Sequence, residues 1–165
     1  MRKKNTYCSF CGEAFMPGNF PKQCERCKET TWSNPIPVVS ALVPIGAGLL
    51  GIVRGTTPIG GLAFPGGYVD HGESFRDAAS RELWEETSLR IHPDAFEIVR
   101  DQPSSSGVTV MIFVRCRYVF AASLADLPVF IPNPEVRERV VLFGDEDLAF
   151  GSHTKALRDH FADRL

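Results

Sequence analysis

The chain has 165 residues, enough for one ordinary domain and a small appendage, and 44% of them are apolar, which supports a buried core. A net charge of −2 excludes a general attraction to nucleic acid or to an anionic membrane. The longest apolar stretch, residues 38–53, is broken by Pro44 and three glycines and is shorter than the roughly 20 residues that span a bilayer. No apolar segment follows the basic N-terminus, so we expect neither a membrane span nor a secretory signal, but a cytoplasmic protein.

The first predicted unit covers residues 1–34 and contains two Cys-x2-Cys pairs. The four cysteines are Cys8, Cys11, Cys24 and Cys27, and twelve residues separate the two pairs. Two thiolate pairs on turns can surround Zn²⁺ tetrahedrally and leave no open position for chemistry. The segment is poor in aliphatic residues, so it needs such a staple to hold a fold. We therefore predict a small zinc ribbon with structural Zn²⁺; the alternative is a set of four free thiols.

The second predicted unit, residues 35–165, begins at a proline-rich junction and has the pattern of an α/β domain. Its apolar runs predict strands at residues 38–43, 49–53, 62–64, 96–100, 108–120 and 136–143. Helical patterns cover residues 75–87 and 153–164, and residues 121–134 have the composition of a loop. Cys116 lies within an apolar strand pattern, so we expect it in the core.

The first predicted helix has local signals for its beginning and for its buried face. Ser74 is the predicted N-cap and Asp77 stands three residues further on, an arrangement that resembles a capping box. The apolar residues recur at the spacing of one helical stripe, and they are Phe75, Ala78, Ala79 and Leu83.

The same helix carries a cluster of acidic residues near its end. Glu82, Glu85 and Glu86 stand at positions i, i+3 and i+4, so their side chains share one face and repel one another. Arg81 is the local compensation, within reach of Asp77 or Glu85. A divalent cation would neutralise the cluster, and carboxylate oxygens suit Mg²⁺ or Mn²⁺. The alternative is a solvated acidic face, the usual explanation of an isolated Glu-Glu pair.

Residues 67–89 resemble the signature of the Nudix hydrolase family far beyond the acidic cluster. The matching residues are Gly67, Glu73, Arg81, Glu82, Leu83, Glu85, Glu86 and Leu89. Ser88 departs from the signature, because the family has Gly just past the end of the helix. That position favours a left-handed backbone, which a residue with a Cβ adopts at a cost of about 1 kcal/mol.

The resemblance implies a fold and a set of roles. The fold would be an α/β/α sandwich with a mixed sheet, and the enzyme would use Mg²⁺ or Mn²⁺ to hydrolyse a diphosphate linkage. Glu82 and Glu86 would be the main metal ligands, and Glu85 would be a further ligand or a water-activating base. Glu73 would support the metal shell, and Arg81 would orient the carboxylates. Gly66 and Gly67 would allow the backbone to approach the site closely. The general base of this family often lies on a later loop, where Glu135 is the first candidate and Glu138 the second.

A zinc ribbon directly before a Nudix domain resembles the NADH pyrophosphatases and a plant-type group acting on FAD or ADP-ribose. Asn34-Pro35 at the junction fits this resemblance. The NADH-specific motif is absent, since residues 102–106 read Gln-Pro-Ser-Ser-Ser. We therefore expect a small-molecule substrate such as ADP-ribose or another ADP-linked compound, cleaved to AMP and a second phosphorylated half.

Two other functions fit parts of the sequence. A Nudix domain can sense a nucleotide without cutting it, but the intact set of acidic and Arg residues of the signature argues against a pure sensor. Action on RNA 5′ ends, with the basic ribbon as docking surface, is a further alternative; the ribbon offers no clear aromatic-and-Arg platform for bases, so nucleic acid is not the expected partner. Members of the family often dimerise to complete the substrate pocket, and a homodimer is an expectation of the same kind.

Overall fold

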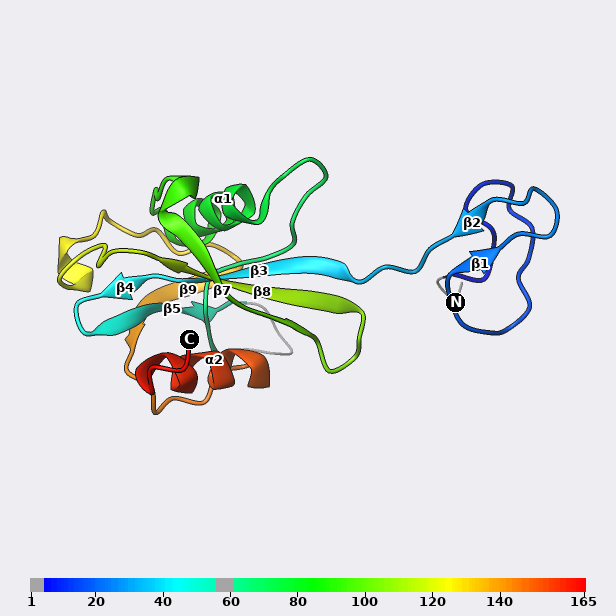
Figure 1. The fold of residues 1–165 in the computed structure, drawn as a ribbon. Coiled ribbons are helices and arrows are strands. Elements are labelled where there is room, and N and C mark those ends of the chain that lie inside the picture. Colours follow the sequence, from blue (N-terminus) through cyan, green and yellow to red (C-terminus); the bar gives the residue numbers. More distant parts are fainter. Residues whose placement is uncertain (1–4, 56–60) are drawn as a thin grey trace. The chain divides into compact units, whose positions relative to one another are not determined.

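The structure is a computed structural model that describes residues 5–55 and 61–165. The chain forms two compact units, of which the first ends at Pro35 and the second runs from Ile36 to Leu165. The first unit contains a small antiparallel hairpin of β1 (Lys22–Gln23) and β2 (Thr30–Thr31), surrounded by turns (Figure 1).

The second unit is built on two sets of strands that contain both parallel and antiparallel pairs. The first set has the order β3 (Ile36–Leu42), β8 (Thr109–Cys116), β7 (Phe96–Pro103), with β3 parallel to β8 and β7 antiparallel to it. In the second set β5 (Gly48–Arg54) pairs antiparallel with β4 (Pro44–Ile45), β6 (Gly61–Ala63) and β9 (Val136–Leu142). The predicted mixed sheet is therefore confirmed.

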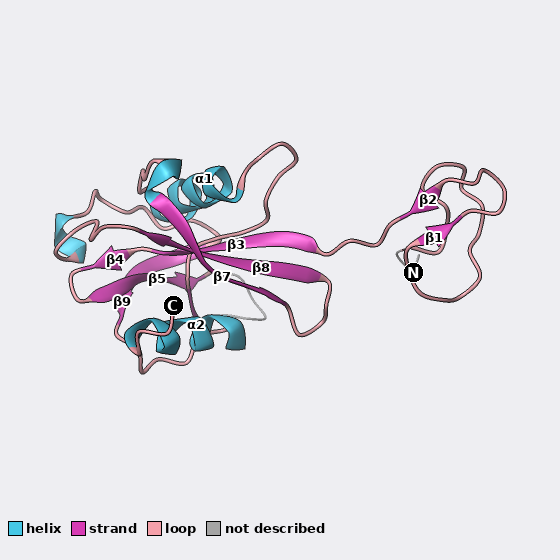
Figure 2. Ribbon diagram, in the orientation of Figure 1, coloured by secondary structure: helices cyan, strands magenta, loops and turns pink. Residues whose placement is uncertain are grey.

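Helices cover both faces of the strands. Figure 2 shows α1 (Phe75–Thr87) on one face and α2 (Gly151–Phe161) on the other, so the second unit is an α/β/α sandwich as predicted. Two short 3-10 turns, Pro93–Ala95 and Leu124–Asp126, complete the described helical segments. None of the helices in residues 5–55 and 61–165 has the length and apolar character needed to cross a membrane.

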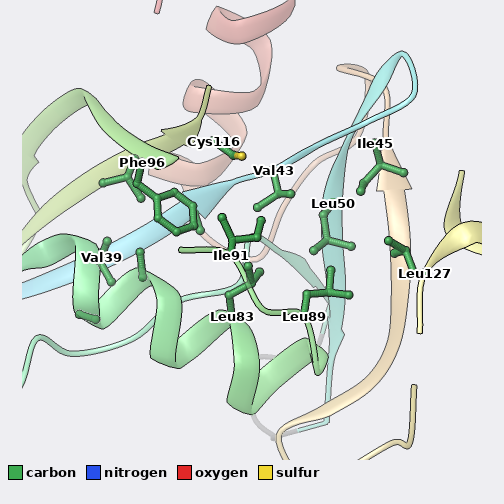
Figure 3. Packing of buried hydrophobic residues seen from close by; sticks show 14 residues of the cluster. Val39, Val43, Ile45, Leu50, Leu83, Leu89, Ile91, Phe96, Cys116 and Leu127 are labelled. Carbon is green, nitrogen blue, oxygen red and sulfur yellow. The ribbon is translucent and has the colours of Figure 1, made fainter. Parts of the chain in front are cut away.

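Side chains of β3 alternate between the two layers, as the period of a strand requires. Val39 and Ala41 belong to the buried cluster that includes Leu83 of α1, whereas Leu42 belongs to the cluster beneath α2. Figure 3 shows the first cluster, with Leu83 close to Ile91 and with Cys116 among the labelled residues. Cys116 is 1% exposed, which confirms its predicted place in the core.

The structure corrects the ends of several predicted elements. The strand predicted at 38–43 occupies Ile36–Leu42, and the strand predicted at 96–100 continues to Pro103. The strand predicted at 108–120 stops at Cys116, because the next amide, Arg117 N, donates to Ala95 O, outside the β7 ladder. The closing helix predicted at 153–164 occupies Gly151–Phe161 instead. Phe150 precedes it without a side-chain cap, so the sequence contains no local signal for its first turn.

Candidate active site

Local sequence determines where α1 begins and ends. The Ser74 hydroxyl accepts from Asp77 N at 3.2 Å and the Asp77 carboxylate accepts from Ser74 N at 3.2 Å, which confirms the predicted capping box. At the other end Ser88 adopts the left-handed conformation, with φ of 60°, and its N–H donates to Trp84 O. The caps therefore fix both ends of the helix, and the acidic residues lie in its last turn.

A glycine segment next to α1 supplies a backbone donor to the deepest carboxylate. Residues 65–67 run beside β3, because Ala41 N donates to Pro65 O at 2.9 Å and Val39 N to Gly67 O at 2.8 Å. Gly66 N in turn donates to Glu86 Oε2 at 2.8 Å. Gly66 has φ of +151°, and a Cβ there would lie 2.1 Å from Val39 O, so a larger residue would break this contact.

The neighbouring glycine leaves room for a second carboxylate. A Cβ on Gly67 would lie 2.3 Å from Glu82 Oε1, inside any real van der Waals contact. Gly66 and Gly67 thus allow the backbone to lie close to Glu86 and Glu82.

Arg81 binds three carboxylates with one guanidinium group. Its Nε donates to Glu73 Oε1 at 2.8 Å, and Nη1 donates to Glu82 Oε1 at 2.8 Å and to Glu85 Oε2 at 3.1 Å. The Arg81 hydrogen bond lowers the pKa of Glu73, and the same acidic partners raise the pKa of Arg81. Of the two partners that the sequence places within reach, Arg81 pairs with Glu85, while the Asp77 carboxylate is engaged in the capping box. Arg81 thereby holds the Glu82 carboxylate in position.

Two of the acidic side chains are partly or fully withdrawn from water. Glu86 is 5% exposed, and burial raises its pKa to about 7, with Glu82 and Glu135 adding to the effect. Burial also raises the pKa of Glu82. Both residues line a cavity of about 340 Å³ that Glu135 lines as well. Carboxylate oxygens around a space of this size are the donor set that Mg²⁺ or Mn²⁺ prefers, so the residues present fit the implied ion.

The two candidate bases lie in different surroundings. The loop that carries Glu135 is tied to α1, since Asn133 Nδ2 donates to Glu85 O at 3.3 Å while Asn133 Oδ1 accepts from Glu135 N at 2.9 Å. Glu135 faces the cavity that Glu82 and Glu86 line. Glu138 lies on β9 opposite Val53 and does not line this cavity in the part of the chain that the structure describes.

A second, larger cavity of about 940 Å³ adjoins the first, and sequence reasoning identified Gly66 and Gly67 but missed its other lining residues. The two cavities share Arg54, Gly66, Gly67 and Tyr68 in their linings. Arg54 ends β5 and its guanidinium lies 5.2 Å from the centre of the Phe150 ring. For Arg54 the available sequence signal was its charge at the end of an otherwise apolar strand. The remaining lining residues come from five separate segments of the chain, which no single motif connects.

The four cysteines of the first unit converge on one point. Their sulfur atoms all lie within 4.8 Å of one another, and Cys8 Sγ is 3.6 Å from Cys27 Sγ, as is Cys11 Sγ from Cys24 Sγ. Tetrahedral Zn²⁺ with Zn–S bonds of about 2.3 Å requires S···S distances of about 3.8 Å, so the thiol set fits the ion.

Two equivalent turns position these cysteines. Gly12 N donates to Cys8 O at 3.0 Å and Lys28 N donates to Cys24 O at 2.8 Å, and both donors have positive φ. The Cys11 backbone amide is the main cause that lowers the pKa of Cys8, to about 6, whereas burial and the neighbouring thiols raise the pKa of Cys27 to about 12. Without a metal the four thiols therefore do not ionise alike. The cluster is compatible with a small zinc-binding motif.

Known proteins share this architecture. A family model described as the NUDIX domain matches residues 35–156. A NUDIX hydrolase from Nitrosomonas europaea is 24% identical, with 96% of this chain and 92% of that chain covered and a TM-score of 0.69. The MutT protein from Methanosarcina mazei Go1 is 19% identical, with coverage of 81% and 97% and a TM-score of 0.60. A bifunctional NMN adenylyltransferase/ADP ribose pyrophosphatase from Francisella tularensis, complexed with AMP and a Mn ion, is 22% identical, with coverage of 78% and 38% and a TM-score of 0.52.

Proposed function

The chain belongs to the Nudix family of hydrolases, and we propose that it cleaves the diphosphate linkage of a nucleoside diphosphate joined to another group. The observation that carries the proposal is the cavity that Glu82, Glu86 and Glu135 all line, next to a larger cavity with apolar walls. The first has the carboxylates to hold a divalent cation, through which a diphosphate would bind, and the second has the volume for an attached group.

We assign roles from the cavity lining and from the resemblance. Glu82 and Glu86 would hold Mg²⁺ or Mn²⁺. Glu85 pairs with Arg81 and is not among the described residues that line the cavity, so its role as a further ligand rests on the resemblance alone. When bound, the ion neutralises phosphate charge, lowers the pKa of a water and stabilises the leaving phosphate. Glu135, which lines the cavity, would take the proton of the attacking water as general base.

Two positioning residues complete the proposed machinery. Arg81 bonds both Glu73 and Glu82, so it fixes the direction of the Glu82 carboxylate toward the cavity. Glu73 in turn accepts from Asp70 N at 3.0 Å, which ties this network to the loop before α1. Neither needs to touch the substrate to act.

We propose an ADP-linked compound, ADP-ribose first, as the substrate class. The similar Francisella tularensis protein is an ADP ribose pyrophosphatase complexed with AMP and a Mn ion, which supports an adenine nucleotide and a divalent ion without defining either for this chain. The zinc-ribbon resemblance points to the same class, and the cysteine unit would hold Zn²⁺ in a structural role.

Incubation with a panel of compounds tests this function. The purified protein with Mg²⁺ or Mn²⁺ would be given ADP-ribose, NADH, NAD⁺, FAD, diadenosine polyphosphates and capped RNA, and products separated by chromatography. We expect AMP from ADP-ribose, lost in Glu86→Gln and retained in Glu138→Gln, whose carboxylate lies outside the cavity lining. Tight binding of one compound without turnover of any would instead identify a nucleotide sensor.

A further inference from the structure

A buried histidine on α2 has its hydrogen bonds directed by the backbone. His153 is 4% exposed, and its ring lies among three phenylalanine rings, with centroids 5.6 Å from Phe64, 5.6 Å from Phe113 and 5.1 Å from Phe150. Phe64 N donates to His153 Nδ1 at 3.2 Å. A backbone N–H can only donate, so Nδ1 carries no hydrogen and the imidazole is neutral. Burial, which lowers the pKa of His153 to about 4, agrees with the neutral ring.

The other ring nitrogen then has one available role. In the neutral ring Nε2 carries the hydrogen. Ser40 Oγ lies 3.1 Å from Nε2, so the serine oxygen accepts this bond. The Ser40 hydroxyl consequently must direct its own hydrogen elsewhere.

Ser40 is a hydrogen-bond donor that faces the large cavity. It is 2% exposed and belongs to the lining of the 940 Å³ cavity. Among residues 5–55 and 61–165, the sole hydrogen-bond partner of its side chain is His153. A buried donor of this kind costs free energy unless a partner reaches it, and the partner must come from the cavity.

The surroundings define the chemistry of that partner. Phe64, Met111 and Phe150 give the cavity apolar walls, and Gln102 adds an amide. Ser40 also lies near the smaller, acidic cavity through Gly66. A Cβ on Gly66 would lie 2.9 Å from Ser40 Cα, and Gly66 N donates to Glu86. A flat, apolar group attached to the diphosphate fits between these walls.

We propose that Ser40 is a specificity-determining residue that donates a hydrogen bond to an acceptor atom of the substrate, held in the donating orientation by His153. The acceptor belongs to a planar heterocycle and is an unprotonated ring nitrogen or a carbonyl oxygen. The inference rests on the proposed function, because it treats the large cavity as part of the substrate site.

Kinetics of Ser40→Ala with ADP-ribose test the donor. We expect the KM to rise by about 3- to 10-fold with kcat nearly unchanged, as for the loss of one hydrogen bond to a neutral acceptor. Ser40→Thr keeps the hydroxyl and restores the KM. Ser123→Ala is the control, because Ser123 is exposed to water and lines neither of the two cavities. A lowered melting temperature of Ser40→Ala with an unchanged KM would mean that Ser40 merely satisfies His153, and would overturn the inference.

Nitrogen NMR of histidine-labelled protein tests the direction of the bond independently of activity. We expect His153 to be protonated at Nε2 and unprotonated at Nδ1 at neutral pH, and AMP to shift both resonances in the wild type more than in Ser40→Ala. The opposite tautomer overturns the inference. If no compound of the panel is hydrolysed, the proposed catalysis fails, whereas an absent AMP shift at His153 then rejects the role of Ser40.

Discussion

Glu86 combines deep burial with acidic neighbours, so the metal-free protein carries an unfavourable charge at neutral pH. Its pKa lies at about 7, above the ordinary value of 4.5. A carboxyl with a raised pKa in the folded state favours folding where it is protonated, and that contribution is lost as pH rises from 4.5 to about 7. The loss is on the order of 3 kcal/mol.

Thermal unfolding in EDTA between pH 4.5 and 8 measures this effect by comparison with Glu86→Gln. We expect the wild type to lose stability over that range relative to the variant, and the variant to be the more stable protein at pH 8. Mg²⁺ should stabilise the wild type and leave the variant unchanged. If the two proteins lose stability equally over this pH range, the pKa of Glu86 is not raised in the folded protein.

At the residue scale, sequence spacing could identify the acidic side chains of the helix and the Arg81–Glu85 pair, but not the partners that lie on other segments. Glu82 and Glu86 follow from helical periodicity, which is a local property. Arg81 binds Glu73, eight positions away on a loop, and only the folded loop brings them together. Ser40 and His153 are 113 positions apart, so their contact had no sequence signal.

The C-terminal end of α1 carries measurable strain. Ser88 has φ of 60°, a region where glycine is favoured over residues with a Cβ. We expect Ser88→Gly to raise the free energy of unfolding by about 0.5–1 kcal/mol without changing kcat, because no metal-binding side chain is altered. Urea unfolding gives the first quantity; a destabilised variant would contradict the conformational argument.

The N-terminal end of the same helix depends on one side chain. Removal of the hydroxyl in Ser74→Ala leaves Asp77 N without its acceptor and should cost about 1 kcal/mol. The same urea measurement applies, with Ser123→Ala as control, since Ser123 precedes a short turn without a side-chain cap bond. Equal stabilities of the Ser74 and Ser123 variants would contradict the capping role.

At the element scale, predictions succeeded where the signals were local. The bounds of α1 matched because its cap and stripe lie within the helix itself. The predicted end of β8 was too late because Phe120 is apolar and fits a strand pattern, although it lies outside the strand, where its N–H donates to Pro44 O. The predicted start of α2 differs from the observed one because no side chain caps its first turn, so the local sequence has no signal for it.

For the molecule as a whole, the two compact units predict separate responses to loss of zinc. Cys8→Ser should bind less than one Zn²⁺ per chain and lose the dispersed amide NMR signals of residues 5–34, because that unit has little core of its own. The melting of residues 36–165 should change little. Cys116→Ala is the opposite control: it keeps the zinc and destabilises the α/β unit, since Cys116 is buried there. Wild-type protein without zinc by metal analysis would contradict the assignment.

The central claim is that buried carboxylates on α1 serve a divalent ion that acts on a diphosphate. Initial rates of AMP release from ADP-ribose, measured against Mg²⁺ concentration for the wild type and Glu86→Gln, test it most directly. We predict saturable dependence on Mg²⁺ in the wild type, no activity after chelation, and a loss of at least about 100-fold in the variant. AMP release that persists in EDTA, or a variant as active as the wild type, would contradict the claim.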